Sequence, residues 1–250
     1  MSPNRAAGID IGSRTTKLVV LGTGEPVVQE ARDTSHDPLS VCAALLEGRH
    51  PEALVATGYG RHLFAEHYDC QVVTEIKALA RGASALVPGC RTLLDIGGQD
   101  MKTVALGDQG QVLRFEMNDR CAAGTGRFLE VMATALHCRY DDLWREALTA
   151  AEPVTVNSTC AVFAESEVVG LIARGANRPA VAAGIHHAVA KRATAMLKRV
   201  SLVPPVVFAG GVATNGCLVR LLQASLDTAV IVPDEPRFAV ALGAALLAKG

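Results

Sequence analysis

Short apolar runs that end in glycine turns set the pattern of the first part of the chain. Residues 7–12, Ala-Gly-Ile-Asp-Ile-Gly, predict a buried strand, and residues 16–21 predict a second strand that returns after a tight turn rich in hydroxyl groups. Residues 53–57 predict a strand that ends in the turn Gly58-Tyr59-Gly60. Helices are expected at about 37–48, with Pro38 in the first turn, and from Thr74 as N-cap to about residue 87.

The same strand-and-turn pattern returns later in the chain. Residues 93–98, Leu-Leu-Asp-Ile-Gly-Gly, predict a strand into a glycine turn, and residues 101–106 predict the returning strand. The tripeptide Asp95-Ile96-Gly97 repeats Asp10-Ile11-Gly12 after 85 residues. This period is too long for a solenoid and indicates an internal duplication of one supersecondary unit.

The remaining pattern is mostly helical. Helices are expected at 122–136, 161–174, 179–199, 215–225 and 238–249, with short strands at 206–209 and 229–232. The residues His186 and His187 lie in one of these helices and are expected to be a solvated or packing pair.

Composition and charge exclude several classes of function. The chain has 250 residues, of which half are apolar, and a net charge of −1 with 4% aromatic residues. This balance gives no basic or base-stacking surface for nucleic acid. The N-terminal residues have no apolar signal segment, and the longest apolar run, 239–248, is about half of a membrane span. We therefore expect a cytoplasmic protein that binds neither nucleic acid nor a membrane.

The two Asp-x-Gly hairpins predict a polyphosphate site. We expect them to face each other and to bind the polyphosphate between them. Glycine turns bring backbone N–H groups close to phosphate oxygens, and hydroxyl groups and Lys17 add donors and positive charge. Asp10 and Asp95, at the ends of their strands, could hold Mg²⁺. Gln99 or Asp100 could orient the attacking water. The phosphate-binding residues predicted in the two turns are Gly12, Ser13, Arg14, Thr15, Thr16, Lys17, Gly97, Gly98 and Asp100.

A third segment, residues 207–215, predicts where a base and ribose would lie. A buried strand, the double glycine Gly210-Gly211, Val212 and then a helix start at Asn215 let a planar group approach the backbone. Together the three segments resemble the phosphate-1, phosphate-2 and adenosine motifs of the acetate and sugar kinase, Hsp70 and actin superfamily. The resemblance implies an α/β, actin-like, two-domain ATPase with duplicated βββαβα-type domains. It places one domain at 1–90 plus 235–250 and the other at 91–234.

Seven cysteines are present, without a C-x-x-C pair, so neither a disulfide framework nor a zinc ribbon is expected. Cys121 and Cys160 have matching contexts, because each follows a polar triplet and precedes a helix-forming run. Both thiols are therefore expected at or near a helix N-terminus, where unpaired N–H groups and the helix dipole favour negative charge. This environment suits thiolates that bind an anionic iron–sulfur cluster.

Two cysteines do not complete a [4Fe–4S] cluster, which takes four. A two-fold symmetric homodimer solves this, because each copy presents the same pair. A cluster shared by two chains through Cys121 and Cys160 is therefore predicted. The other five cysteines are expected to be small core or surface residues.

The chain resembles, almost end to end, the ATP-hydrolysing activators of 2-hydroxyacyl-CoA dehydratases, a family that includes the ATPase subunits of benzoyl-CoA reductase. The resemblance lies in several segments: residues 8–13, 56–61, 95–100, 118–130, 158–167, 210–212 and 231–233. The segment around Cys121 is the most specific of them.

The resemblance implies a homodimer that binds ATP or ADP with Mg²⁺ and one bridging [4Fe–4S] cluster, with Cys121 and Cys160 as its ligands. It implies reduction by a ferredoxin or flavodoxin. It also implies ATP-driven transfer of one electron to a 2-hydroxyacyl-CoA dehydratase, a benzoyl-CoA reductase or a related double-cluster reductase. The nucleotide-site pattern of the family is matched by Asp10, Gly12, Ser13, Asp95, Gly97, Gly98, Gln99, Gly210 and Gly211.

Three alternatives stay open at the level of sequence. A small-molecule kinase of the same fold, such as an amino-sugar kinase, would use Asp95 or Asp100 as its catalytic acid and would have no cluster. A filament or regulatory protein of the actin fold would catalyse nothing. A heterodimer with a paralogous chain could replace the homodimer.

Overall fold

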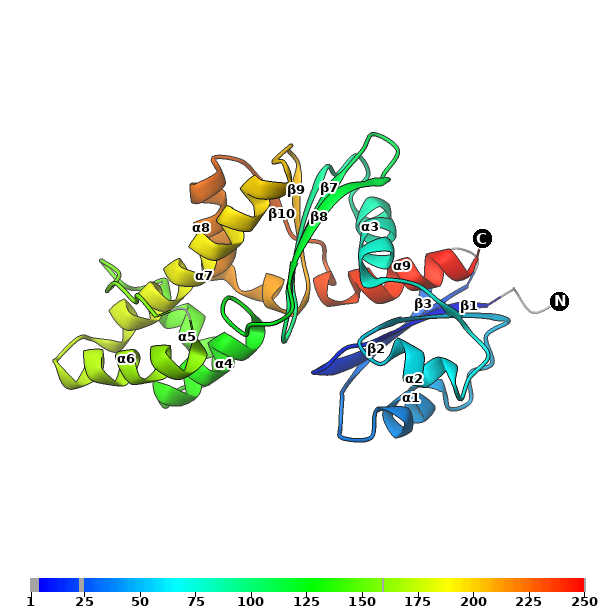
Figure 1. Cartoon of the computed structure of the whole chain (residues 1–250), viewed down its shortest axis with the longest axis horizontal. Helices are drawn as coiled ribbons and strands as arrows, with labels where there is room; N and C mark the ends of the chain where they lie inside the picture. The colour runs from blue at the N-terminus through cyan, green and yellow to red at the C-terminus, as the bar shows by residue number, and fades with distance from the viewer. Residues whose placement is uncertain (1–4, 23–24, 159, 250) are drawn as a thin grey trace. The chain divides into compact units, whose positions relative to one another are not determined.

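The computed structural model describes residues 5–22, 25–158 and 160–249. The described chain divides into two compact units. The first contains Met1–Arg91, Leu106–Leu113 and Pro233–Gly250, and the second contains Thr92–Ala105 and Arg114–Val232. Figure 1 shows the elements of both units. Within the described residues, no helix is both long enough and apolar enough to cross a membrane.

Each unit is built on a five-stranded mixed sheet. The first sheet has the order β3-β2-β1-β4-β5 and consists of β1 (Ala6–Ile11), β2 (Thr15–Leu21), β3 (Pro26–Asp33), β4 (Ala53–Gly58) and β5 (Gln71–Val72). The second sheet has the order β8-β7-β6-β9-β10 and consists of β6 (Thr92–Ile96), β7 (Met101–Leu106), β8 (Val112–Asn118), β9 (Val206–Ala209) and β10 (Val230–Ile231).

The two sheets repeat one topology. In the first, β1 is antiparallel to β2 and parallel to β4, and in the second, β6 is antiparallel to β7 and parallel to β9. The predicted duplicated α/β fold is thereby confirmed. The strands β3, β5 and β8 were not predicted. Both β3 and β8 are edge strands with few buried residues, so they lack the apolar run by which the inner strands are found.

The helices differ between the units. The first unit has α1 (Pro38–Leu46), α2 (Arg61–Ala65), α3 (Glu75–Leu86) and α9 (Ala239–Ala248). The second has α4 (Gly126–Ala135), α5 (Tyr140–Ala147), α6 (Ala161–Ala173), α7 (Arg178–Val200) and α8 (Gly216–Leu226). The predicted cap Thr74 is confirmed, because its hydroxyl accepts the N–H of Lys77 at 3.3 Å. Asn215, which was expected only at a helix start, is also a cap: its amide oxygen accepts the N–H of Leu218 at 3.1 Å.

One predicted helix start is wrong. A helix was expected from about residue 122, directly after Cys121, but α4 begins at Gly126. Residues 122–125 form a turn in which the N–H of Thr125 donates to the carbonyl of Ala122 at 3.0 Å. Gly124 has a φ of +84°, a left-handed conformation that a continuing α-helix does not contain. Cys121 therefore lies in a loop before the helix.

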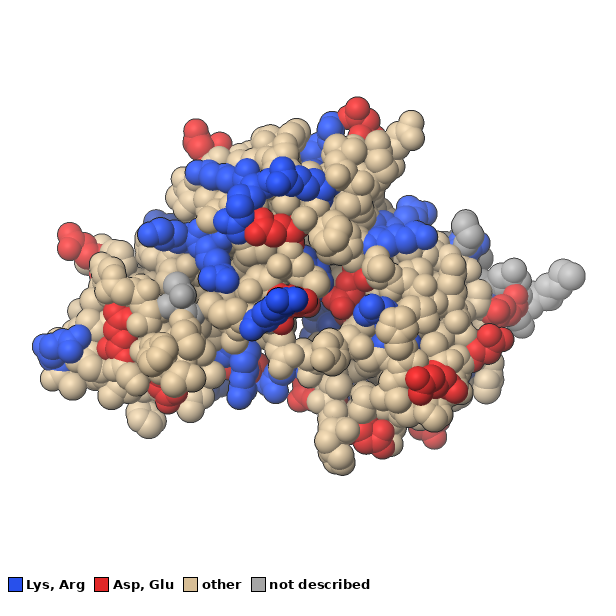
Figure 2. Space-filling view, in the orientation of Figure 1, with Lys and Arg blue, Asp and Glu red and all other residues tan. Residues whose placement is uncertain are grey.

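Apolar side chains fix the helices of the second unit around its sheet. Phe128 and Leu129 of α4, Ile185 and Val189 of α7 and Phe208 of β9 are all buried in one core. On the surface, Arg199 near the end of α7 donates from Nε to the Glu116 carboxylate of β8 at 2.8 Å. This ion pair ties the longest helix to the outer strand. Figure 2 shows Lys and Arg side chains gathered over the α7 and α8 part of the unit.

Candidate functional site

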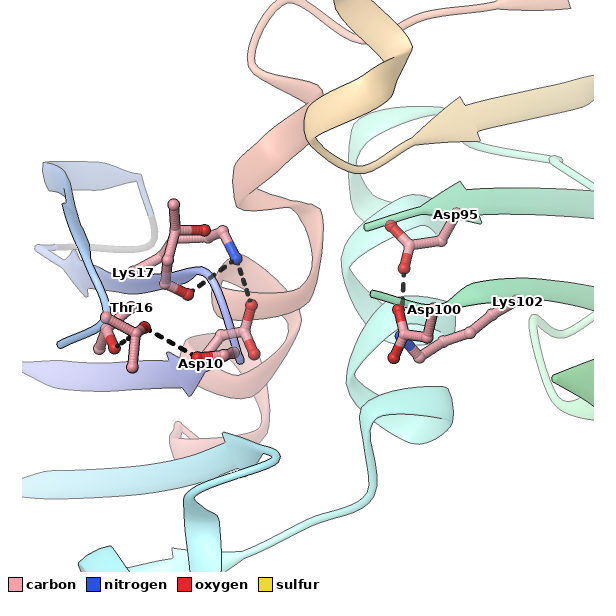
Figure 3. A network of polar contacts seen from close by, with 9 residues as sticks. Asp10, Thr16, Lys17, Asp95, Asp100 and Lys102 are labelled. Carbon is pink, nitrogen blue, oxygen red and sulfur yellow. Dashed lines mark hydrogen bonds and ion pairs between the residues drawn. The ribbon is translucent and has the colours of Figure 1, made fainter. Parts of the chain in front are cut away.

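The hairpin of the first unit places a carboxylate and an ammonium group next to its turn. Asp10 of β1 and Lys17 of β2 are direct cross-strand partners. The Lys17 Nζ donates to Asp10 Oδ2 at 2.9 Å and to the Thr15 carbonyl at 3.4 Å (Figure 3). The turn closes where the N–H of Gly12 donates to the same Thr15 carbonyl at 3.2 Å. Both side chains are largely buried, at 14% and 8% exposed.

The hairpin of the second unit repeats this arrangement. Asp95 of β6 and Lys102 of β7 are cross-strand partners, and the N–H of Gly97 donates to the Asp100 carbonyl at 3.0 Å. Lys102 is 3% exposed and contacts two carboxylates (Figure 3), Asp95 at 3.5 Å and Asp100 at 2.7 Å. The duplicated tripeptide of the sequence is therefore a duplicated ion pair at a duplicated turn.

A glycine from the neighbouring parallel strand completes each copy. Gly58 at the end of β4 and Gly210 after β9 both have a φ of +89°. A Cβ on Gly58 would lie 2.7 Å from Asp10 Oδ1, and one on Gly210 would lie 2.7 Å from Asp95 Oδ1. Both positions thus need a left-handed backbone and no side chain.

The predicted phosphate-binding residues divide into two groups. The accessible group is exposed or partly buried and contains Gly12, Ser13, Arg14, Thr15, Lys17, Gly97, Gly98 and Asp100. Gln99, predicted to orient the attacking water, is exposed. Thr16 differs, because its hydroxyl is buried and lies 2.9 Å from that of Thr34. Thr34 in turn donates to the Gly12 carbonyl at 2.8 Å. Thr16 therefore supports the first turn from behind and does not offer a donor to a ligand.

The predicted adenosine segment likewise contains accessible and buried positions. Gly211 is exposed, and a Cβ built on it would meet no atom within 4 Å. Val212 and Asn215 are buried at 3% and 1%. The Asn215 amide oxygen caps α8, and its nitrogen lies 3.0 Å from His186 Nε2. The backbone at Gly211 is accessible, whereas the Asn215 side chain caps α8 and contacts His186.

His186 is a buried histidine with both ring nitrogens in contact, so a solvated pair with His187 is ruled out for it. Its Nδ1 lies 2.7 Å from the Ala182 carbonyl, which can only accept, so Nδ1 carries the proton and Nε2 accepts from Asn215. Burial lowers the pKa of His186 to about 4, against the opposing effect of the Ala182 carbonyl. The ring is therefore neutral at pH 7.

The Gly97–Gly98 turn of the second hairpin is hydrogen-bonded to the start of α4, the helix that follows the Cys121 loop. The N–H of Gly126 donates to the Gly97 carbonyl at 2.9 Å, and the N–H of Arg127 donates to the Gly98 carbonyl at 2.8 Å. These are orphan donors of the first turn of α4, which a helix must satisfy outside itself. A Cβ on Gly126 would lie 3.2 Å from the Gly97 oxygen. The turn and the helix start therefore form one hydrogen-bonded piece.

Cys121 lies in a loop that is fixed by its own polar contacts. The N–H of Ala123 donates to Cys121 Sγ at 3.4 Å. The Asn118 side chain donates to the carbonyls of Cys121 and Ala123 at 2.9 and 3.2 Å. The thiol is half-buried.

Cys160 is the N-cap residue of α6, as predicted, and its thiol is exposed. Thr159, part of the predicted motif, lies outside the described residues. The Glu167 carboxylate accepts the N–H groups of Asn157 and Ser158 at 2.9 and 2.7 Å. Burial alone would raise the pKa of Glu167, but these hydrogen bonds outweigh it and lower the pKa to about 2. The Glu167 carboxylate is therefore ionised at neutral pH, and it holds the segment that leads to Cys160.

Other thiols differ from these two. Burial raises the pKa of Cys42 to about 12 and that of Cys217 to about 11. Among the described residues, no three or more His, Cys, Asp or Glu side chains come together in a way that could hold a metal ion.

The amino-acid sequence matches a known protein family. The model described as the BadF/BadG/BcrA/BcrD ATPase family matches residues 7–248. The chain belongs to this family. Its fold is that of the actin-like ATPases, as the duplicated sheets indicate.

Members of the BadF/BadG/BcrA/BcrD family are similar over nearly their full length. The activator of lactoyl-CoA dehydratase from Anaerotignum propionicum is 43% identical, over 96% of each chain. The activator of the 2-hydroxyisocaproyl-CoA dehydratase from Clostridium difficile, solved with bound ADPNP, is 40% identical with a TM-score of 0.90, over 98% of this chain and 94% of that one. Component A of the (R)-2-hydroxyglutaryl-CoA dehydratase from Acidaminococcus fermentans is 37% identical with a TM-score of 0.90, over 98% and 97%.

Four residues of the site were not singled out from the sequence. Lys102 could have been found, because it follows Lys17 by the same 85 residues that separate the two aspartates. Gly58 was read only as a turn, although its place after a strand matches that of Gly210. Asn118 and Glu167 stand at the ends of the two cysteine motifs, but which backbone groups they contact is visible only in the fold.

Proposed function

We propose that this chain is an ATP-hydrolysing activator that transfers electrons at low potential to a CoA-ester dehydratase or reductase, through a [4Fe–4S] cluster shared by two copies. The similar proteins are activators of such dehydratases. The observation that carries the proposal is the pair of hydrogen bonds that joins Gly97 and Gly98 to the start of α4, five residues after Cys121. It gives a physical connection between a phosphate turn and a cysteine.

The residues present fit a cluster held by two chains. Cys121 already receives a backbone N–H on its sulfur, the kind of hydrogen bond found at cluster thiolates. Cys160 is exposed at the start of α6, where N–H groups without helical partners favour negative charge. Val162 and Phe163 beside it are 70% and 68% exposed and could lie against a second copy. Two thiols from each of two symmetric copies would supply the four ligands.

Each hairpin turn offers groups that would bind a nucleotide. The N–H groups and hydroxyls of the first turn, Gly12 to Thr15, and those around Gly97 and Gly98 would bind phosphate oxygens. Asp10 and Asp95 would hold Mg²⁺ or its waters, and the ammonium groups of Lys17 and Lys102 would neutralise phosphate charge. The exposed Gln99 would orient the attacking water. The double glycine Gly210-Gly211, of which Gly211 is exposed, would accept the adenosine.

Coupling would follow from the same contacts within the second unit. A phosphate that moves the Gly97–Gly98 turn must move the N-terminus of α4, since two backbone hydrogen bonds join them. The loop of Cys121 precedes that helix and would change its orientation or exposure to water. When bound, the cluster supplies one-electron chemistry, and its potential depends on exposure and hydrogen bonding. The nucleotide state would thus bias a two-state element at a distance.

Two classes of partner follow from the proposed function. A ferredoxin or flavodoxin would reduce the activator. The acceptor would be a 2-hydroxyacyl-CoA dehydratase, a benzoyl-CoA reductase or a related double-cluster reductase.

Anaerobic purification tests the proposal. The wild-type protein is expected to be a brown dimer with about four irons and four sulfides per two chains, and to hydrolyse ATP. Cys121→Ala and Cys160→Ala should each lose the visible absorbance and keep nucleotide binding, whereas the matched control Cys138→Ala should keep both. A wild-type protein without iron and sulfide, or single variants that retain the absorbance, would contradict the proposal.

A further inference from the structure

Two polar side chains outside the proposed ligand set hold the segments that lead to the two cysteines. Asn118 is the last residue of β8, three residues before Cys121. Glu167 lies in the second turn of α6, seven residues after Cys160. Neither contacts the phosphate turns, and the proposed function gives them no role.

Asn118 sets the shape of the Cys121 loop. Its amide nitrogen has two hydrogens, and these are donated to the carbonyls of Cys121 and Ala123, two residues apart. Because both carbonyls are held on one side, the N–H of Ala123 is directed at Cys121 Sγ, 3.4 Å away. The Thr125 hydroxyl donates to the intervening carbonyl of Ala122 at 2.6 Å. The loop is therefore folded around the sulfur without help from any ligand.

Glu167 has the corresponding role before Cys160. Its Oε1 accepts the backbone N–H of Asn157 at 2.9 Å and the side-chain amide of the same residue at 3.2 Å. Its Oε2 accepts the N–H of Ser158 at 2.7 Å. One carboxylate of the helix thus folds back on the segment that enters that helix, and it satisfies two backbone donors.

We propose that Asn118 and Glu167 are positioning residues, one for each cysteine, that hold both ligand loops in their binding conformation before a cluster is assembled. This inference rests on the proposed function, since it concerns the geometry of Cys121 and Cys160 as cluster ligands. Pre-organised loops bind a group more tightly because less conformational freedom is lost on binding.

The two residues should have separable effects. When Asn118 is removed, the loop is no longer held, and the Ala123 N–H loses its orientation toward the Cys121 sulfur. A hydrogen bond to a cluster sulfur stabilises the more negative, reduced state, so its loss should shift the reduction potential to a more negative value. Removing Glu167 leaves the Cys121 sulfur untouched, so it should weaken cluster retention without that shift.

The experiment compares the reconstituted wild-type protein with Asn118→Ala, Glu167→Ala and Glu167→Gln under anaerobic conditions. Asp119→Ala and Glu165→Ala are the matched controls, exposed neighbours from the same segments. Iron release to a chelator should become about tenfold faster in Asn118→Ala and Glu167→Ala. This is the effect expected when the hydrogen bonds between these side chains and the backbone of the ligand loops are lost. Glu167→Gln keeps one acceptor oxygen and should restore part of the retention. Only Asn118→Ala should shift the potential.

A measurement on the unmodified protein covers variants that fail to fold. In both the cluster-free and the loaded wild-type protein, the amide hydrogens of Asn157 and Ser158 should exchange slowly, because both donate to Glu167. Unprotected amides in the cluster-free protein, or release rates and potentials equal to those of the wild type in all variants, would overturn the inference. A wild-type protein that takes up no cluster would instead contradict the proposed function.

Discussion

The two units build the same hairpin but support it differently. In the first, Thr34 at the end of β3 holds the turn by donating to the Gly12 carbonyl, and the chain then passes through the single helix α1 before β4. In the second, the turn carbonyls of Gly97 and Gly98 accept from the start of α4. The segment between β8 and β9 contains four helices, α4 to α7.

This difference separates two tasks within one duplicated fold. The shared part is an aspartate, its cross-strand lysine and a left-handed glycine. The part that differs is the inserted segment, which contains both Cys121 and Cys160 and is joined to its turn through α4. On the proposed function, the duplicated part would bind the nucleotide, and the insertion in one copy would connect it to the two cysteines.

The lysines offer the sharpest test of this comparison. Lys102→Met leaves the buried Asp95 and the half-buried Asp100 without their ammonium partner, and should lower the free energy of unfolding by about 3 to 5 kcal/mol. Lys17→Met leaves one carboxylate, Asp10, without its partner, in a pair whose lysine is more exposed than Lys102, and should cost about half as much. Urea denaturation of both variants measures the difference. Equal losses would mean that Asp100 adds nothing to the second hairpin.

A pH titration of stability tests the second unit by itself, because His186 contacts Asn215 in the predicted adenosine segment. Its folded pKa of about 4 lies below the unfolded value of 6.5, so the unfolded state binds the proton more readily. Its contribution to stability is complete above pH 6.5 and is lost as the pH falls toward 4, by about 3 kcal/mol in total.

The stability of the wild-type protein and of His186→Leu, measured from pH 7 to pH 4, isolates this contribution. The variant should be less stable at pH 7 and should lack the steep decline, whereas the exposed control His187→Leu should behave like the wild type. A decline that persists unchanged in His186→Leu would show that another group titrates.

The smallest effect is expected at the support of the first turn. Thr34→Val removes one donor to the Gly12 carbonyl and the contact with the Thr16 hydroxyl, at a cost of about 1 kcal/mol. Nucleotide affinity should fall modestly and the iron content should stay unchanged, because the cysteines belong to the other unit. Calorimetry with ADP and iron analysis measure the two. Loss of iron in this variant would break the comparison.

Much of this arrangement could be predicted from the sequence, and the limits have physical causes. The duplicated tripeptide and the glycine turns depend on local pattern, so both hairpins were found. The start of α4 was misplaced because Asn118 and Asp119 look like capping residues, whereas Asn118 bonds to the loop and the helix begins after Gly124.

The contacts that a sequence does not reveal are those between distant segments. Thr16 and Asn215 are predicted to bind nucleotide, and the structure shows that their side chains contact Thr34 and His186, which are 18 and 29 residues away. Whether a polar group faces a ligand or a buried neighbour is decided by such contacts. A pattern along the chain does not contain them.

Because the Cys160 thiol is exposed, its chemical state depends on how the protein is prepared. Oxidants in air reach exposed thiols first and convert them to sulfenic acid or mixed disulfides, while thiols in the core, such as Cys42, stay protected. Preparation in air would therefore damage a residue on which the proposal depends and leave the fold intact. A colourless, folded, nucleotide-binding protein obtained in this way would report on its handling, and only material kept from oxygen since lysis can decide what the two cysteines hold.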